Sequence, residues 1–148
     1  MAADVAEVLL AVQSCLGTPL DSVEAAVHKA ATKDGGTITQ IALSFSKHTV
    51  CIGTAGSGGL RLADLAPVTD MGEFGRIEHE HLASPVVGSP LRRVSRLLLD
   101  ELGADDKEPM GVALGFDAGE LWIFNRADDL CVVDGQTGGQ SNYFLHLE

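Results

Sequence analysis

The chain has 148 residues, and ten Lys and Arg against twenty-one Asp and Glu give it a formal net charge of −11. Its hydrophobic content of 45% is near the globular average, which excludes disorder as the main state. The sequence shows no basic patch for nucleic-acid binding, and no apolar run approaches the roughly 20 residues that cross a bilayer.

The predicted elements begin with a helix near the N-terminus. Asp4 is expected to be its N-cap, and Glu7 three residues later completes a capping-box pattern. The helix should end before Gly17, because Thr18 and Pro19 follow as a stop signal. The first residues lack the basic start and cleavage site of a signal peptide, so we expect a cytoplasmic protein.

Residues 20–30 leave two interpretations open. Val23, Ala25 and Val27 alternate as in a strand, whereas the alanine content also suits a helix. The segment 91–102 carries the same ambiguity.

The other apolar segments are typical of strands joined by short loops, which requires antiparallel pairing. The predicted strands are residues 38–46, 49–54, 60–62, 111–116, 120–125, 130–133 and 143–147. Residues 65–87 are rich in turn residues and charge, and we expect them to form an irregular crossover.

An internal repeat relates two parts of the chain at a shift of 71 residues. Gly17-Thr18-Pro19-Leu20 matches Gly88-Ser89-Pro90-Leu91, and the pseudo-repeats span about residues 17–64 and 88–134. We therefore predict one α+β domain over residues 1–148. It should consist mainly of antiparallel β meanders from an internal duplication, with the N-terminal helix packed on the sheet.

The sharpest local motif is Glu78-His79-Glu80-His81. On a strand, His79 and His81 would share one face and could hold a divalent metal ion. A small metal-binding domain or a metal-dependent enzyme is therefore an alternative function. The other interpretation is a solvated charged loop, because neither a third ligand nor an HExxH motif can be identified.

Motifs for covalent catalysis are missing from the sequence, which has no GxSxG and no phosphate-binding loop ending in GK[ST]. The three cysteines, Cys15, Cys51 and Cys131, are odd in number and form no CxxC pair. Neither a disulfide framework nor a zinc site is indicated, so a reducing compartment is expected. We predict that the protein is not an enzyme and uses no cofactor.

The acidic residues gather at the ends of elements and in turns, where they would create a negative field that steers a basic partner. The candidate partner-binding residues are Glu78, Glu80, Asp105, Asp106, Asp128 and Asp129. A small acidic protein of this kind fits an inhibitor of a basic protein such as a nuclease, whose active site is built for phosphates. The alternative is an acidic surface that only confers solubility.

Residues 111–130 read GVALGFDAGELWIFNRADDL. This block resembles small bacterial proteins with a strand, an F-D-x-G turn, a second strand and an N-x-x-D-[DE]-L ending. Some of them are immunity proteins of polymorphic toxin systems, including contact-dependent growth inhibition. The resemblance implies an inhibitor that binds the C-terminal domain of a cognate toxin as a 1:1 heterodimer. It assigns no catalytic residue, because Phe116, Gly119, Leu121 and Ile123 fit core or turn roles.

Overall fold

The computed structural model of the chain describes residues 2–29, 36–46, 48–55, 59–99, 108–126, 129–134 and 144–147. The N-terminal part contains α1 (Ala2–Gln13), β1 (Leu20–Lys29), β2 (Thr37–Phe45), β3 (Thr49–Thr54), β4 (Leu60–Leu62), β5 (Thr69–Asp70), the 3₁₀ turn η1 (Gly72–Phe74) and β6 (Arg76–His81). The C-terminal part contains β7 (Leu91–Leu99), β8 (Glu108–Phe116), β9 (Gly119–Arg126), β10 (Asp129–Asp134) and β11 (Phe144–Leu147).

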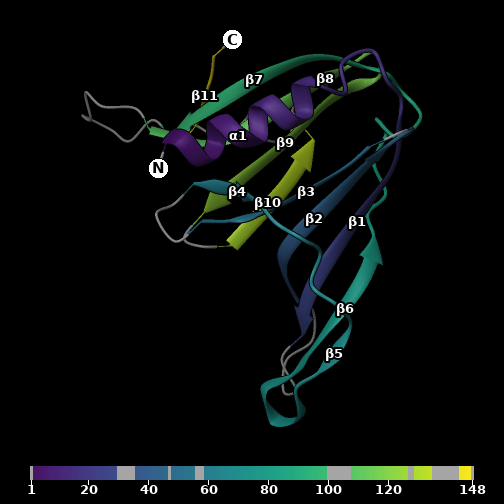
Figure 1. The fold of residues 1–148 in the computed structure, drawn as a ribbon, viewed down its shortest axis with the longest axis vertical. Coiled ribbons are helices and arrows are strands. Elements are labelled where there is room, and N and C mark those ends of the chain that lie inside the picture. The colour runs from purple at the N-terminus through teal and green to yellow at the C-terminus, as the bar shows by residue number, and fades with distance from the viewer. Residues whose placement is uncertain are drawn as a thin grey trace.

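The strands form two antiparallel sheets (Figure 1). The first sheet has the order β4-β3-β2-β1-β6-β5, and the second sheet has the order β10-β9-β8-β7-β11. An isolated antiparallel bridge between Pro19 and Pro90 joins the sheets where β1 and β7 begin. This arrangement confirms the predicted α+β class, with antiparallel meanders and a helix packed on them.

The internal repeat extends to the register of the strands. Leu20 pairs with Phe45 in the first sheet, and Leu91 pairs with Phe116 in the second, 71 residues further along in both strands. The register shifts also coincide, because they fall at Leu20/Ser22 and Ala26/Val27 in β1 and at Leu91/Arg93 and Leu97/Leu98 in β7. β6 pairs with β1 and β11 pairs with β7, so each meander has a further antiparallel strand beside its first strand.

The two sheets exchange hydrogen bonds through a symmetric pair of glycines. The Gly17 amide donates to the Leu91 carbonyl over 2.7 Å, and the Gly88 amide donates to the Leu20 carbonyl over 2.6 Å. Both glycines have a positive φ, 84° for Gly17 and 91° for Gly88, which favours a residue without a side chain. We call this exchange the seam; it places the two halves in approximate two-fold relation.

The main core lies between the sheets and under α1. Along β8 and β9, Val112, Leu114 and Ile123 point into it and alternate with residues of the opposite face. We call the core side of each sheet its inner face and the other side its outer face. From α1, Val5, Val8 and Val12 are fully buried in this core, and the helix contacts β3 and β4 of the first sheet and β7 and β8 of the second. The spacing of the three valines keeps one side of the helix on the core.

The outer faces of the two sheets differ. On the second sheet, Leu97, Ala113, Trp122 and Phe124 form a separate buried apolar cluster. On the first sheet the outer face combines small residues such as Ala26 and Ala42 with polar ones such as Gln40. The segment 63–66 that follows β4 lies on this face, where the Ala66 amide donates to the side-chain oxygen of Gln40.

Three expectations from the sequence are corrected or resolved. The helix begins at Ala2, two residues before the expected N-cap Asp4. The ambiguous segments are strands over Leu20–Lys29 and Leu91–Leu99. The crossover 65–87 is not simply irregular, because it contains β5, η1 and β6.

Candidate partner-binding surface

The candidate surface is the hairpin formed by β5, η1 and β6. β6 is polar almost throughout, and its backbone pairs with β1 on one side and β5 on the other. These ladders make it a strand although its sequence lacks an apolar alternation. In Figure 1 the hairpin extends to the lower end of the molecule, away from α1.

The tip of the hairpin is held by local hydrogen bonds. The Met71 amide donates to the Gly75 carbonyl over 2.8 Å, and the Gly72 amide donates to Oδ1 of Asp70 over 2.9 Å. Gly72 and Gly75 have φ values of 64° and 100°, which the sharp turn requires. The turn is therefore ordered although it is largely exposed.

An aromatic side chain is presented at this tip. Phe74 is 72% exposed, and Val68, at the start of the hairpin, is 66% exposed. The backbone of Phe74 is fixed to β1, because its carbonyl lies 3.0 Å from Nε2 of His28. Asp70 and Glu73, which precede Phe74 in the same turn, are exposed as well. Phe74 and Val68 were not among the residues predicted from the sequence, and the only signal for Phe74 is a Phe between the turn glycines.

Glu78 and Glu80 lie on β6 and share one cation. Nζ of Lys29 is 2.9 Å from Glu78 and 2.6 Å from Glu80, and Arg76 pairs with Glu78 as well. Hydrogen bonds from Lys29 and then Arg76 hold the pKa of Glu78 below its ordinary value, and the two glutamates raise the pKa of Lys29. Both predicted residues thus lie on the hairpin, where their ion pairs with Lys29 also connect β6 to β1.

The other predicted residues lie elsewhere in the sequence. Asp129 is exposed at the start of β10, on the second sheet, and pairs in register with Arg126. Asp105, Asp106 and Asp128 fall outside the described residues. The structure therefore brings together Glu78 and Glu80 but not Asp129.

The two histidines of the EHEH motif do lie on the same face of β6, the outer face of the first sheet. His79 has Nδ1 3.2 Å from Oε1 of Glu24 and its Nε2 against the carbonyl of Ala66, while His81 pairs in register with Glu24. Within the described ranges, no three His, Cys, Asp or Glu side chains gather as a metal site would require. The ring nitrogens of His79 instead hold the segment after β4 to the sheet.

The Asn of the motif around residues 111–130 has a structural role. Asn125 is fully buried, and its side-chain amide donates to the carbonyls of Ala55 at 3.1 Å and Gly59 at 2.8 Å. It thereby joins β9 of the second sheet to the connection between β3 and β4 of the first.

No helix in the described part of the chain has the length and apolar content needed to cross a lipid bilayer. Comparison with protein-family models, with curated proteins and with solved structures gives no match for this chain.

Proposed function

We propose that this protein is an immunity-type inhibitor that neutralises a basic toxin domain, of nuclease type, by forming a 1:1 complex with it in the bacterial cytoplasm. The observation that carries this proposal is the exposed Phe74 on an ordered acidic hairpin. Aromatic side chains, Phe included, are enriched in the buried cores of protein interfaces. An exposed aromatic ring on a turn that also carries Asp70 and Glu73 suits a partner that has an apolar pocket bordered by Lys or Arg.

The charge of the chain supports the same class of partner. A net charge of −11 on 148 residues attracts a basic protein over a distance and raises the rate of association. The ion pairs of Lys29 with Glu78 and Glu80 hold the base of the hairpin in place. We assign Phe74 and Glu73 to direct contact, with Glu78 and Glu80 at the edge of the interface. The predicted Asp105, Asp106, Asp128 and Asp129 add to the negative charge that attracts the partner.

The first test is capture of the partner from a lysate of the native cells with the tagged protein, washed at low and then moderate salt. Mass spectrometry should identify one basic protein at near-equal stoichiometry. The recombinant partner is then titrated against the wild type and variants by calorimetry. A neutral partner, or an affinity independent of salt, contradicts the proposal.

Phe74→Ala should lower the affinity at least about tenfold, because an anchor residue contributes roughly 2 kcal/mol or more. The matched control is Leu10→Ala, since Leu10 is 68% exposed on α1, away from the hairpin. The affinity of the Leu10→Ala variant for the partner should stay within about twofold of wild type, and neither substitution should shift the thermal midpoint. Equal affinities for the two variants would show that the hairpin is not the interface.

A further inference from the structure

Within the described residues, α1 is the only α-helix. At the shift of 71 residues, α1 (Ala2–Gln13) would correspond to residues 73–84. Half of that segment is β6, which pairs with β1 as a strand of the first sheet. The second repeat thus has no counterpart of the first turns of α1 on its side of the core.

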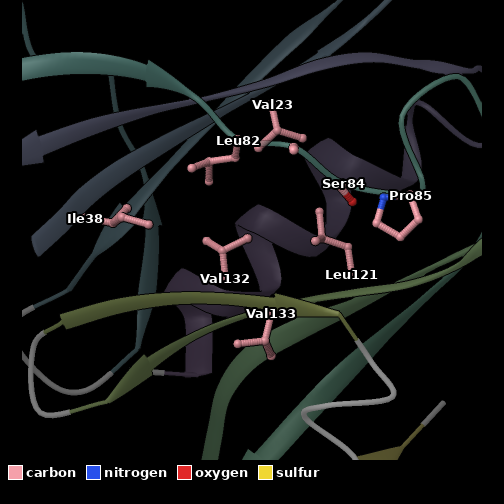
Figure 2. A pocket seen from close by; sticks show the side chains of 9 residues that line it. Val23, Ile38, Leu82, Ser84, Pro85, Leu121, Val132 and Val133 are labelled. Carbon is pink, nitrogen blue, oxygen red and sulfur yellow. The ribbon is translucent and has the colours of Figure 1, made fainter.

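A groove lies on that side. Its volume is about 330 Å³, within the range of roughly 300–1,000 Å³ seen for binding sites. Val23 and Leu121 are 2% and 3% exposed and form its base, and Ile38, Leu82 and Val132 are half-buried around it. Figure 2 shows Val23, Leu82, Ile38, Leu121 and Val132 around one space, with Ser84 and Pro85 at its side. We call it the second groove.

The strands that line the second groove are the repeat counterparts of the strands that α1 contacts. α1 contacts β3, β4, β7 and β8. The repeat counterparts of these strands are β9, β10, β1 and β2, and all four contribute to the second groove. Val23 takes the position of Val94 in this correspondence, and Leu121 that of Val50. The surface that holds a helix in one half is therefore present, with similar apolar residues, in the other.

The strands beside the second groove are arranged differently from those around α1. β10 packs directly on β2 beside it, whereas α1 contacts both β4 and β8 on the other side. The space therefore suits side chains inserted from a helix that lies across the mouth, rather than a whole helix sunk between the sheets. The pattern that fills the first site is Val5, Val8 and Val12, which are fully buried at positions i, i+3 and i+7.

One acidic side chain, Asp21, lies next to the second groove, in a hollow that His81 also lines. Asp21 is exposed and lies in an adjoining hollow that shares Val23, Leu82 and Ser84 with the groove. A lysine or arginine on the flank of an inserted helix would face this carboxylate, in a protein with a net charge of −11.

We propose that the second groove is a docking site for an amphipathic α-helix of a partner protein, with branched apolar side chains at i, i+3 and i+7 and a basic flank. This is a helix-in-groove mode of recognition. It does not rest on the proposed function, because the hairpin and the second groove are different surfaces and either can bind without the other.

The probe is a synthetic peptide with the sequence of residues 2–17, in which the exposed Glu7 and Gln13 are replaced by lysine. It is titrated into the intact ¹⁵N-labelled, methyl-labelled protein and followed by NMR and calorimetry. We expect saturable 1:1 binding, with the largest shifts at Val23, Ile38 and Val132. A peptide that also carries Val8→Asp should bind at least about tenfold more weakly.

Two protein variants locate the site. Ile38→Glu places a charge in the second groove, and Ser84→Trp fills its mouth without removing an apolar residue. Each should lower peptide affinity at least about tenfold while thermal unfolding remains cooperative. The matched control is Leu62→Glu, on β4 beside α1, where the side chain is 42% exposed; it should leave the affinity within twofold.

Several results would overturn the proposal. These are the absence of saturation at about 1 mM peptide, equal binding of the two peptides, or insensitivity to both groove variants. If only Leu62→Glu weakens binding, the peptide replaces the protein's own α1. Binding of a small apolar dye but not of the peptide would make the second groove a small-molecule site. A dimer that Ile38→Glu dissociates in sedimentation would make a second copy the occupant.

Discussion

The two sheets share the same strand arrangement and register, but the side chains on their outer faces differ. Trp122 and Phe124 of the second sheet are buried in an apolar cluster on its outer face. The same positions in the first sheet hold Cys51 and Gly53. On the inner faces the halves agree, because Ile52 and Ile123 occupy equivalent positions and both are fully buried.

Inner-face residues and turn glycines set the register of both sheets, whereas outer-face residues are free to change. Inner-face residues must fill one shared core, and the turn glycines must adopt positive φ, so both are retained in the two repeats. Outer-face residues meet no such shared requirement. The outer face is therefore where each half has acquired its own surroundings: the segment 63–66 on the first sheet and an apolar cluster on the second.

The largest expected difference is between Trp122→Ala and Cys51→Ala. Trp122 is 5% exposed, so its truncation should lower the free energy of unfolding by about 3–5 kcal/mol. Cys51 is only half-buried, and its truncation should cost less than about 1 kcal/mol. Urea denaturation of both variants measures the difference. Equal losses would show that the outer faces contribute alike.

A second test compares two glycines that belong to equivalent cross-strand pairs, one in each sheet. Gln40 pairs with Gly53 in the first sheet, whereas Gly111 pairs with Phe124 in the second, so the large residue has changed strands. A Cβ at Gly111 would lie 2.3 Å from the carbonyl oxygen of Ile123, while the nearest atoms to a Cβ at Gly53 are at 3.4 Å.

Gly111→Ala should therefore destabilise the protein by about 2–3 kcal/mol or more, because a backbone atom must move. Gly53→Ala should cost less than about 1 kcal/mol, since its neighbours are in ordinary contact. Thermal midpoints of the two single variants compare them directly. A neutral Gly111→Ala would mean that β8 and β9 separate more easily than the pairing implies.

The seam predicts equality instead of difference. Gly17 and Gly88 have φ values of 84° and 91°, and neither has an atom within 4 Å of an added Cβ. Alanine at either position should cost about 1–2 kcal/mol from backbone strain alone. Chemical denaturation should give the two variants the same loss within error. A clear inequality would break the two-fold relation of the halves at this point.

The smallest expected effect concerns the ion pairs that each half has acquired. Hydrogen bonds from Lys29 and Arg76 lower the pKa of Glu78 from 4.5, and Arg92 lowers the pKa of Asp117 from 3.8. A carboxylate with a lowered pKa stabilises the fold above its ordinary value, and this stability is lost as the pH falls through the folded value.

Glu78→Gln and Asp117→Asn should each flatten the fall in urea midpoint below about pH 5, and the Glu78 effect should begin at the higher pH. Half-molar salt should reduce both effects, because these groups are exposed. Glu73→Gln is the control, since Glu73 makes no ion pair within the described residues. An unchanged pH profile in both test variants would show that the pairs do not form in solution.

The sequence was sufficient to predict the repeat, the strand pairs of each meander and the N-terminal helix. It left β1 undecided because β1 is buried on both sides: Ala25 and Ala26 are adjacent in sequence and both fully buried. The simple alternation that identifies a half-buried strand is then lost.

The candidate surface was harder to predict. β6 is a strand because of its long-range pairing with β1, and its Glu and His residues gave no apolar signal. Glu78 and Glu80 were selected as acidic, but their shared cation, Lys29, lies some fifty residues earlier in the chain. The exposure of Phe74 follows from the fold and not from its neighbours in sequence.

The seam has a consequence for the ancestry of the fold. Its two hydrogen bonds, from Gly17 to Leu91 and from Gly88 to Leu20, are one contact made twice. That is the contact a half-length chain would make with a second copy of itself in an isologous homodimer. Joining the copies in one polypeptide replaces a concentration-dependent association by an intramolecular one. It also allows one copy to keep a helix and the other to lose it, which identical subunits cannot do.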